Sequence, residues 1–187
     1  MSDHVQAVGA GAAKLLGGQL AGVRYYGLPV GFTDRPWWER ARAHSADYGL
    51  DLVTSEGTYA VTWVPEDIGG YGLDIAKGSL LERRSNEVQV AHVEDSEPWV
   101  SQIGSEICTA NLHVFPFTFC ERTADRVVAL SIQFSTGFGI CFVCGSWDGD
   151  DSPIFVTGDD IVVIWKNETV SAIIPGLAES QVLPPGQ

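Results

Sequence analysis

The clearest pattern in this chain is the alternation of hydrophobic and polar residues in two segments, each interrupted once by a turn. In residues 128–144, hydrophobic side chains recur at every second position on both sides of Ser135-Thr136-Gly137. Residues 49–63 alternate in the same way around Ser55-Glu56-Gly57. Such alternation is typical of half-buried β-strands, and a glycine in the turn supplies the positive φ angle that a tight hairpin requires. We therefore predict two β-hairpins, with the 128–144 hairpin at the centre of the fold.

Two helices are predicted outside these hairpins. Residues 3–16 carry apolar side chains at helical spacing and are followed by a glycine pair that stops a helix, although Gly9 and Gly11 lower the helix propensity. Asp34-Arg-Pro36 combines a capping side chain with a proline that suits a first helical turn. It predicts a short second helix over residues 35–46.

Short apolar runs predict the other strands, and glycine-rich or polar stretches predict the connections. Residues 65–79 are expected to be irregular, Gly158-Asp159-Asp160 to form a turn, and the tail 175–187 to be loose. The strand at 107–115 is expected to end at Pro116. The other predicted strands are residues 20–28, 88–93, 154–156, 161–165 and 170–174.

The length and these elements together predict the fold class. A chain of 187 residues can build one sizeable hydrophobic core. We predict a single α+β domain over residues 1–187, built mainly from antiparallel β-hairpins, with an N-terminal helix and a short second helix.

A weak internal repeat connects the two halves of the chain. Leu16-Gly17-x-x-Leu20 precedes a strand and the first hairpin, and Ile103-Gly104-x-x-Ile107 precedes a strand and the second hairpin. This order of elements suggests a pseudo-duplicated β unit. Chance is the alternative, because hairpins are common and few positions match.

Charge limits the kinds of partner. The chain contains 24 Asp and Glu residues against 11 Lys and Arg, a net charge of −13. Such a field repels a nucleic-acid backbone and attracts basic proteins, although solubility alone also explains acidity. The sequence lacks a signal peptide and a long apolar segment, so we predict a cytoplasmic protein that binds neither nucleic acid nor membranes.

Two motifs that superficially indicate a metal are set aside. Cys141-Phe-Val-Cys144 lies within a predicted strand, where residues three apart point to opposite faces, so both thiolates cannot reach one ion. His92-Val-Glu94 upstream resembles part of the zinc-deaminase pattern, but Ile140 occupies the place of its proline. We therefore predict reduced thiols, no metal and no cofactor, and we assign no catalytic residue.

Acidic clusters in predicted loops are the best candidates for binding groups, because loops on a rigid sheet commonly carry them. Nearby tryptophans could supply an apolar anchor at the centre of an interface. Turn formation is the competing explanation for the aspartates. The predicted partner-binding residues are Glu94, Asp95, Glu97, Trp99, Trp147, Asp148, Asp150, Asp151, Asp159 and Asp160.

Three segments carry a family resemblance, namely residues 49–63, 99–104 and 159–165. They look similar to uncharacterised small acidic α+β proteins of the immunity-protein type in bacterial polymorphic toxin systems. The resemblance implies a non-enzymatic, cytosolic inhibitor that neutralises a basic toxin through an acidic surface. The alternative is an enzyme or small-molecule-binding protein whose site is assembled from residues distant in sequence.

Overall fold

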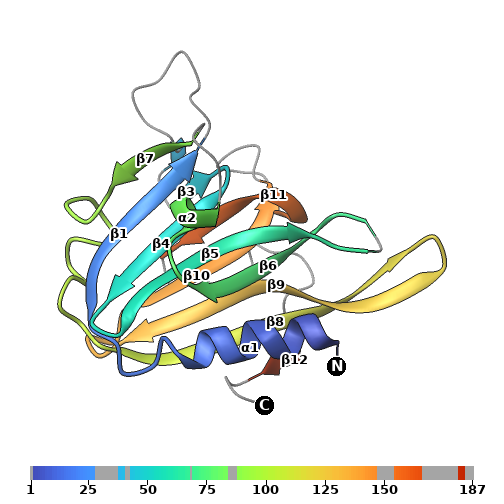
Figure 1. The fold of residues 1–187 in the computed structure, drawn as a ribbon, viewed down its shortest axis with the longest axis horizontal. Coiled ribbons are helices and arrows are strands. Elements are labelled where there is room, and N and C mark those ends of the chain that lie inside the picture. The colour runs from blue at the N-terminus through green and yellow to red at the C-terminus, as the bar shows by residue number, and fades with distance from the viewer. Residues whose placement is uncertain are drawn as a thin grey trace.

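The computed structural model of the chain is a mainly antiparallel β protein in which two sheets pack face to face (Figure 1). It describes residues 2–27, 38–40, 43–67, 69–83, 88–146, 154–165 and 181–183. An N-terminal helix lies along one side of the sheets and a short second helix lies on the first sheet.

The first sheet has five strands in the order β6-β5-β4-β1-β7. Their bounds are β1 Leu20–Gly27, β4 Gly49–Thr54, β5 Gly57–Pro65, β6 Tyr71–Lys77 and β7 Gln89–His92. The predicted hairpin at 49–63 is confirmed as β4 and β5, and Gly57 in its turn has a φ of 131°. The predicted strands at 20–28 and 88–93 are confirmed as β1 and β7.

The second sheet has seven strands in the order β12-β8-β9-β10-β11-β3-β2. The 128–144 hairpin is confirmed as β9 and β10 near the middle of this sheet. The far part of the β8–β9 hairpin projects beyond the sandwich (Figure 1). The strand bounds are β2 Trp38–Arg40, β3 Ala43–Ala46, β8 Ile107–Phe119, β9 Arg122–Phe134, β10 Gly139–Ser146, β11 Phe155–Ile164 and β12 Gln181–Leu183.

The N-terminal helix α1, Asp3–Ala13, confirms the helical spacing at the start of the chain. The hydroxyl of Ser2 caps it by accepting a hydrogen bond from the backbone N–H of Val5. Its buried face contacts β6, β8 and β9, so one helix covers strands of both sheets.

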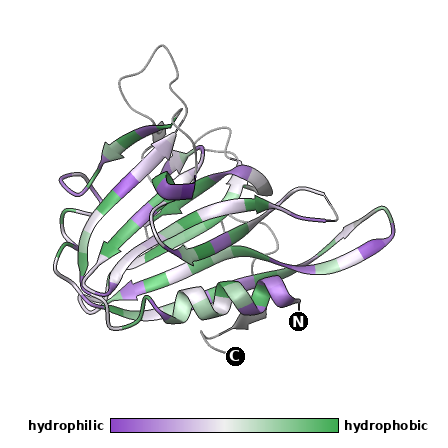
Figure 2. Ribbon diagram, in the orientation of Figure 1, coloured by the Kyte–Doolittle hydropathy of each residue, from purple (hydrophilic) through white to green (hydrophobic). Residues whose placement is uncertain are grey.

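The main hydrophobic core lies between the sheets and contains side chains from both, among them Leu52, Val61, Leu130 and Phe142. Hydrophobic residues recur along the strands of each sheet (Figure 2). A second cluster, which includes Ala129, Cys141 and Val143, lies on the other face of the second sheet. Alternate side chains of β9 and β10 therefore point to opposite faces of the second sheet, and both sets are buried.

The outer face of the first sheet holds the short helix α2, Leu80–Arg83. Asp51 is fully buried beneath it and accepts hydrogen bonds from Tyr26 Oη and Ser79 Oγ, both 2.6 Å, and from the Leu80 N–H at 2.8 Å. Replacement of Asp51 would leave these buried donors without an acceptor, so this carboxylate has a structural role.

The internal repeat has a structural counterpart. Its two Gly-containing motifs pair with each other, with an antiparallel bridge between Gln19 and Glu106. Gly17 donates to the Ile107 carbonyl and Gly104 donates to that of Leu20, and the two glycines have φ angles of 78° and 84°. Each motif is also bonded to the turn of the hairpin that follows it. The Gln19 carbonyl accepts from the Ser55 N–H, and the Glu106 carbonyl accepts from the Ser135 N–H. Each motif also precedes a row of four neighbouring strands. The row is β1-β4-β5-β6 in the first sheet and β8-β9-β10-β11 in the second.

Two predictions about element type are wrong. The helix expected over 35–46 is absent from its described part, because Trp38–Arg40 and Ala43–Ala46 form β2 and β3 at the edge of the second sheet. The short second helix is α2 instead. The connection expected to be irregular at 65–79 contains β6, which pairs with β5 along its length.

Three expected strand boundaries also change. β8 continues through Pro116, where its outer edge has no partner among the described residues, and such an edge tolerates proline. The turn expected at 158–160 is a bulge inside β11, since Cys144 pairs with Ile161 but Gly145 pairs with Val156. Residues Gln181–Leu183 of the tail expected to be loose pair with β8. The strand expected at 170–174 lies outside the described residues.

Candidate functional site

The 94–106 segment connects β7 to β8 across one end of the sandwich (Figure 1). It folds into consecutive turns, in which Val100 donates to the Ser96 carbonyl at 3.0 Å and Ile103 donates to that of Trp99 at 3.1 Å. Gln102 is buried and its Oε1 accepts a 2.7 Å hydrogen bond from Thr136 in the β9–β10 turn. The segment is thus held by its own backbone and by the neighbouring hairpin.

Trp99 fixes this segment to the core, which corrects the prediction that it is an exposed anchor. Its side chain is 0% exposed, and its indole N–H donates to Tyr25 Oη at 2.8 Å. The indole also stacks on the ring of Phe142, with the centroids 6.2 Å apart. Trp99 therefore cannot contact a partner directly, but it determines where the surface residues of the segment lie.

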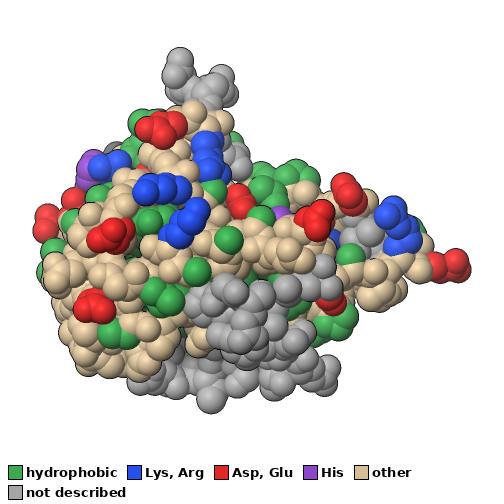
Figure 3. Space-filling model, turned by 60° about the horizontal axis from the view of Figure 1, so that its bottom comes forward, with side chains coloured by type: hydrophobic (Ala, Val, Ile, Leu, Met, Phe, Trp, Pro, Cys, Tyr) green, Lys and Arg blue, Asp and Glu red, His purple; other side chains and the backbone are tan. Residues whose placement is uncertain are grey.

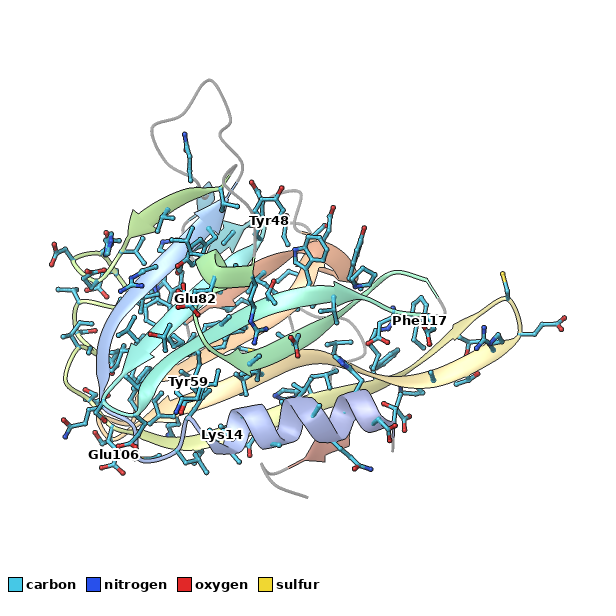
Figure 4. The ribbon with its side chains drawn as sticks, in the orientation of Figure 1. Lys14, Tyr48, Tyr59, Glu82, Glu106 and Phe117 are labelled. Carbon is cyan, nitrogen blue, oxygen red and sulfur yellow. The ribbon has the colours of Figure 1, made fainter. Side chains whose placement is uncertain are left out.

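Exposed carboxylates and two exposed aliphatic side chains make up the surface of the 94–106 segment. Asp95, Glu97 and Glu106 are exposed. Val100 and Ile103 are 49% and 40% exposed and lie in the same run of turns. Figure 4 shows Glu106 at the extreme end of the molecule. Sequence reasoning missed the two aliphatic residues, because they face solvent only as a consequence of the burial of their neighbours Trp99 and Gln102.

Glu94 is the least accessible of the predicted acidic residues in this segment. Its side chain is partly buried, and its Oε1 lies 3.3 Å from His92 Nδ1. The segment nevertheless contains four carboxylates and no lysine or arginine, because its sequence is EDSEPWVSQIGSE. It is therefore an acidic surface on a fixed backbone.

The other predicted acidic residues do not join this surface. Asp159 and Asp160 lie in the β11 bulge beside Cys144 and Gly145, near the end of β10, whereas the 94–106 segment contacts the β9–β10 turn at the start of β10. Acidic and basic side chains are interspersed on the face drawn in Figure 3. Four predicted residues, Trp147, Asp148, Asp150 and Asp151, lie outside the described part of the chain.

Asp160 is half-buried, and burial raises its pKa from 3.8 to about 6, with Asp47 and Asp159 adding to the rise. Ser45 Oγ opposes the rise by donating to its Oδ2 at 3.2 Å. Between pH ~4 and ~6 the folded state retains a proton that the unfolded state has lost, so stability falls as the pH rises through this window.

We expect Asp160→Asn to raise the free energy of unfolding by about 1 kcal/mol at neutral pH, after allowance for solvent screening. The gain should be much smaller at pH 4, where the wild-type carboxyl is protonated in the folded state and partly protonated in the unfolded state. Urea denaturation at the two pH values measures the difference. Asp159→Asn, at the exposed neighbour, is the control and should change less. A gain that persists unchanged at pH 4 would show that ionisation of Asp160 is not the cause.

Cys141 and Cys144 point to opposite faces of the second sheet, as their spacing predicts. Cys144 belongs to the core between the sheets and Cys141 to the cluster on the other face. Burial raises the pKa of each thiol from 9.0 to about 12, which suppresses the thiolate form. Within the described ranges, no group of three or more His, Cys, Asp or Glu side chains is arranged to hold a metal ion.

The alternative hypothesis of an assembled enzyme site directs attention to the polar cluster around Tyr25. Tyr25 Oη lies 3.0 Å from His44 Nδ1 and accepts the hydrogen bond from Trp99. Burial raises the pKa of Tyr25 far above its usual value. All three side chains are at most 1% exposed, so the cluster joins β1 to β3 inside the core and does not meet solvent.

Among the described helices, none is long and apolar enough to cross a membrane. Comparison with known proteins found no matching family model, no matching curated protein and no matching solved structure. The resemblance to immunity proteins therefore stays a prediction.

Proposed function

We propose that this chain is a non-enzymatic protein-binding protein, an immunity- or antitoxin-like inhibitor that neutralises a basic toxin through the 94–106 segment. The observation that carries the proposal is the combination on one fixed segment of Asp95, Glu97 and Glu106 with exposed Val100 and Ile103. Protein interfaces commonly combine an apolar centre with a polar rim.

Electrostatics supports a basic partner. The net charge of −13 steers positively charged proteins toward this chain over long distances, and the segment adds a local excess of negative charge. Complementary charges mainly raise the association rate and select the partner, while the desolvated apolar contacts slow dissociation. In this proposal the carboxylates govern association, and Val100 and Ile103 govern residence time.

The fixed backbone of the segment supports the same function. Trp99 and Gln102 hold it from below, so little conformational entropy is lost when a partner binds. An inhibitor needs no catalytic groups, because covering the active site of its target is sufficient.

The test uses the product of the gene adjacent to this one as the candidate toxin. We expect this chain to relieve its toxicity in growing cells and to bind it in stopped-flow measurements. The triple variant Asp95→Asn, Glu97→Gln, Glu106→Gln should slow association about tenfold at low salt. The difference should shrink at high salt, because the screening length falls from ~10 Å at 0.1 M to ~3 Å at 1 M.

A matched control removes the same amount of charge from exposed positions elsewhere. The variant Asp67→Asn, Glu121→Gln, Asp125→Asn should change the association rate much less, since two of these residues lie on the projecting β8–β9 hairpin. Equal slowing in both variants would assign the effect to net charge and contradict a role for the segment. A neighbouring gene product that this chain neither binds nor neutralises would contradict the inhibitory function.

A further inference from the structure

The 94–106 segment by itself is too small for a complete protein interface. A stable complex usually buries ~800 Å² on each partner and involves about 20–30 residues a side. The segment is shorter than this, and Pro98, Trp99 and Gln102 within it are buried. A toxin that binds the segment must therefore also contact neighbouring parts of the chain at the same end of the sandwich.

Hydrogen bonds show which parts of the chain are these neighbours. The connection from α1 to β1 pairs with the end of the segment and the start of β8, through the bridge between Gln19 and Glu106 and the bond from the Gly17 N–H to the Ile107 carbonyl. The Gln19 N–H donates to Ser55 Oγ at 3.1 Å, and the Gln19 carbonyl accepts from the Ser55 N–H at 2.9 Å. The two motifs of the internal repeat thus join the segment to the α1–β1 connection and to the β4–β5 turn.

These neighbouring parts expose the side chains of Leu16, Gln19 and Glu56. Leu16 is 38% exposed and occupies the same place in its motif as Ile103 in the other motif, so each half of the repeat presents one aliphatic side chain to solvent. The surface next to the segment therefore combines apolar and polar groups, as protein interfaces commonly do.

We propose that the footprint of the toxin, the set of residues that it contacts, extends from the 94–106 segment over Leu16, Gln19 and Glu56 and so spans both halves of the repeat. This extension rests on the proposed function. Leu16 adds apolar area that loses water when the toxin binds, and Gln19 adds hydrogen-bonding groups to the polar rim. The complex should therefore dissociate more slowly than contacts with the segment alone would allow.

Two lysines lie beside this part of the footprint. Lys14 is exposed two residues before Leu16, and Figure 4 shows Lys14 and Glu106 along the lower edge of the molecule. Lys77 lies against the β4–β5 turn, since a Cβ atom at Gly57 would be 3.3 Å from the Lys77 Cε atom. A basic toxin over Leu16 would be repelled by Lys14, so the favourable part of the extension is the apolar contact and not charge.

The first test follows association with the product of the adjacent gene by stopped flow. We expect Lys14→Gln to speed association about twofold at low salt, because it removes a repulsive charge beside the footprint. Arg122→Gln is the matched control. It changes the net charge equally at an exposed position on the projecting β8–β9 hairpin, and it should leave the rate nearly unchanged.

The second test follows dissociation of the same complex. We expect Leu16→Ala to speed dissociation about fivefold, because it removes apolar area from the interface. Leu81→Ala is the matched control, since Leu81 is 52% exposed on α2, on the outer face of the first sheet, and should leave dissociation unchanged. Urea denaturation checks that both variants, at exposed positions, keep the stability of the unchanged chain.

The outcomes separate this extension from the proposed function. If either Leu16→Ala or Lys14→Gln behaves like its control, the footprint does not reach the α1–β1 connection and the extension is wrong. The proposed function would still stand in that case, provided that the triple variant at Asp95, Glu97 and Glu106 slows association. An unchanged chain that does not bind the adjacent gene product would contradict the proposed function and the extension together.

Discussion

Replacement of Trp99 by alanine is expected to lower the free energy of unfolding by about 3–5 kcal/mol, the usual cost of deleting a large buried aromatic side chain. The indole is fully buried, stacks on Phe142 and donates to Tyr25 Oη. Its loss leaves a cavity at the end of the sandwich and removes a hydrogen bond from the buried Tyr25 hydroxyl. Urea denaturation followed by circular dichroism measures the change.

Two further variants separate the contributions of Trp99. Trp99→Phe keeps an aromatic ring against Phe142 but loses the indole N–H, so we expect a smaller loss of about 1–2 kcal/mol. Val100→Ala, at a position 49% exposed, should change stability by less than about 0.5 kcal/mol. If Trp99→Ala were as mild as Val100→Ala, Trp99 would not be holding the 94–106 segment.

The antiparallel hairpins could be predicted from the sequence because their signals are local. Alternation in 128–144 and a glycine at each turn determine strands, turn and facing side chains within a few residues. β6 had the same signal, since Tyr71, Leu73 and Ile75 alternate, but the surrounding glycines concealed it. Glycine content is therefore a poor reason to reject a strand whose side chains alternate.

The wrong helix at 35–46 has a different cause. Ala43–Ala46 has no alternation of its own, yet all four residues are buried as β3. Its partner β11 lies more than a hundred residues later, for example in the pair Ala46 and Ile161. Pairing over such a distance can override local capping signals, and one sequence does not reveal which strand will accept the segment.

The candidate site could be predicted only in part. The acidic residues of the 94–106 segment were found because charge is a property of the sequence. That Trp99 points inward and Val100 and Ile103 outward depends on Tyr25 and Phe142, which come from distant strands.

Replacement of Gly11 by alanine is expected to lower the free energy of unfolding by about 2–3 kcal/mol, although alanine is the better helix former by ~1 kcal/mol. A Cβ atom at Gly11 would lie 2.3 Å from the Ile75 carbonyl oxygen and 3.1 Å from its carbon. Both are backbone atoms of β6, so neither can rotate away, and α1 would have to move off the sheets. Thermal or urea denaturation measures the loss.

Gly9 in the same helix provides a control of opposite sign. The nearest atom to a Cβ at Gly9 is Leu112 Cδ1 at 3.7 Å, which is ordinary van der Waals contact. Gly9→Ala should therefore raise the free energy of unfolding by about 0.5–1 kcal/mol through helix propensity alone. In the sequence both glycines count equally against a helix, whereas in the structure one is dispensable and the other permits the close approach of α1 to β6. Two variants that change stability in the same direction would contradict this packing.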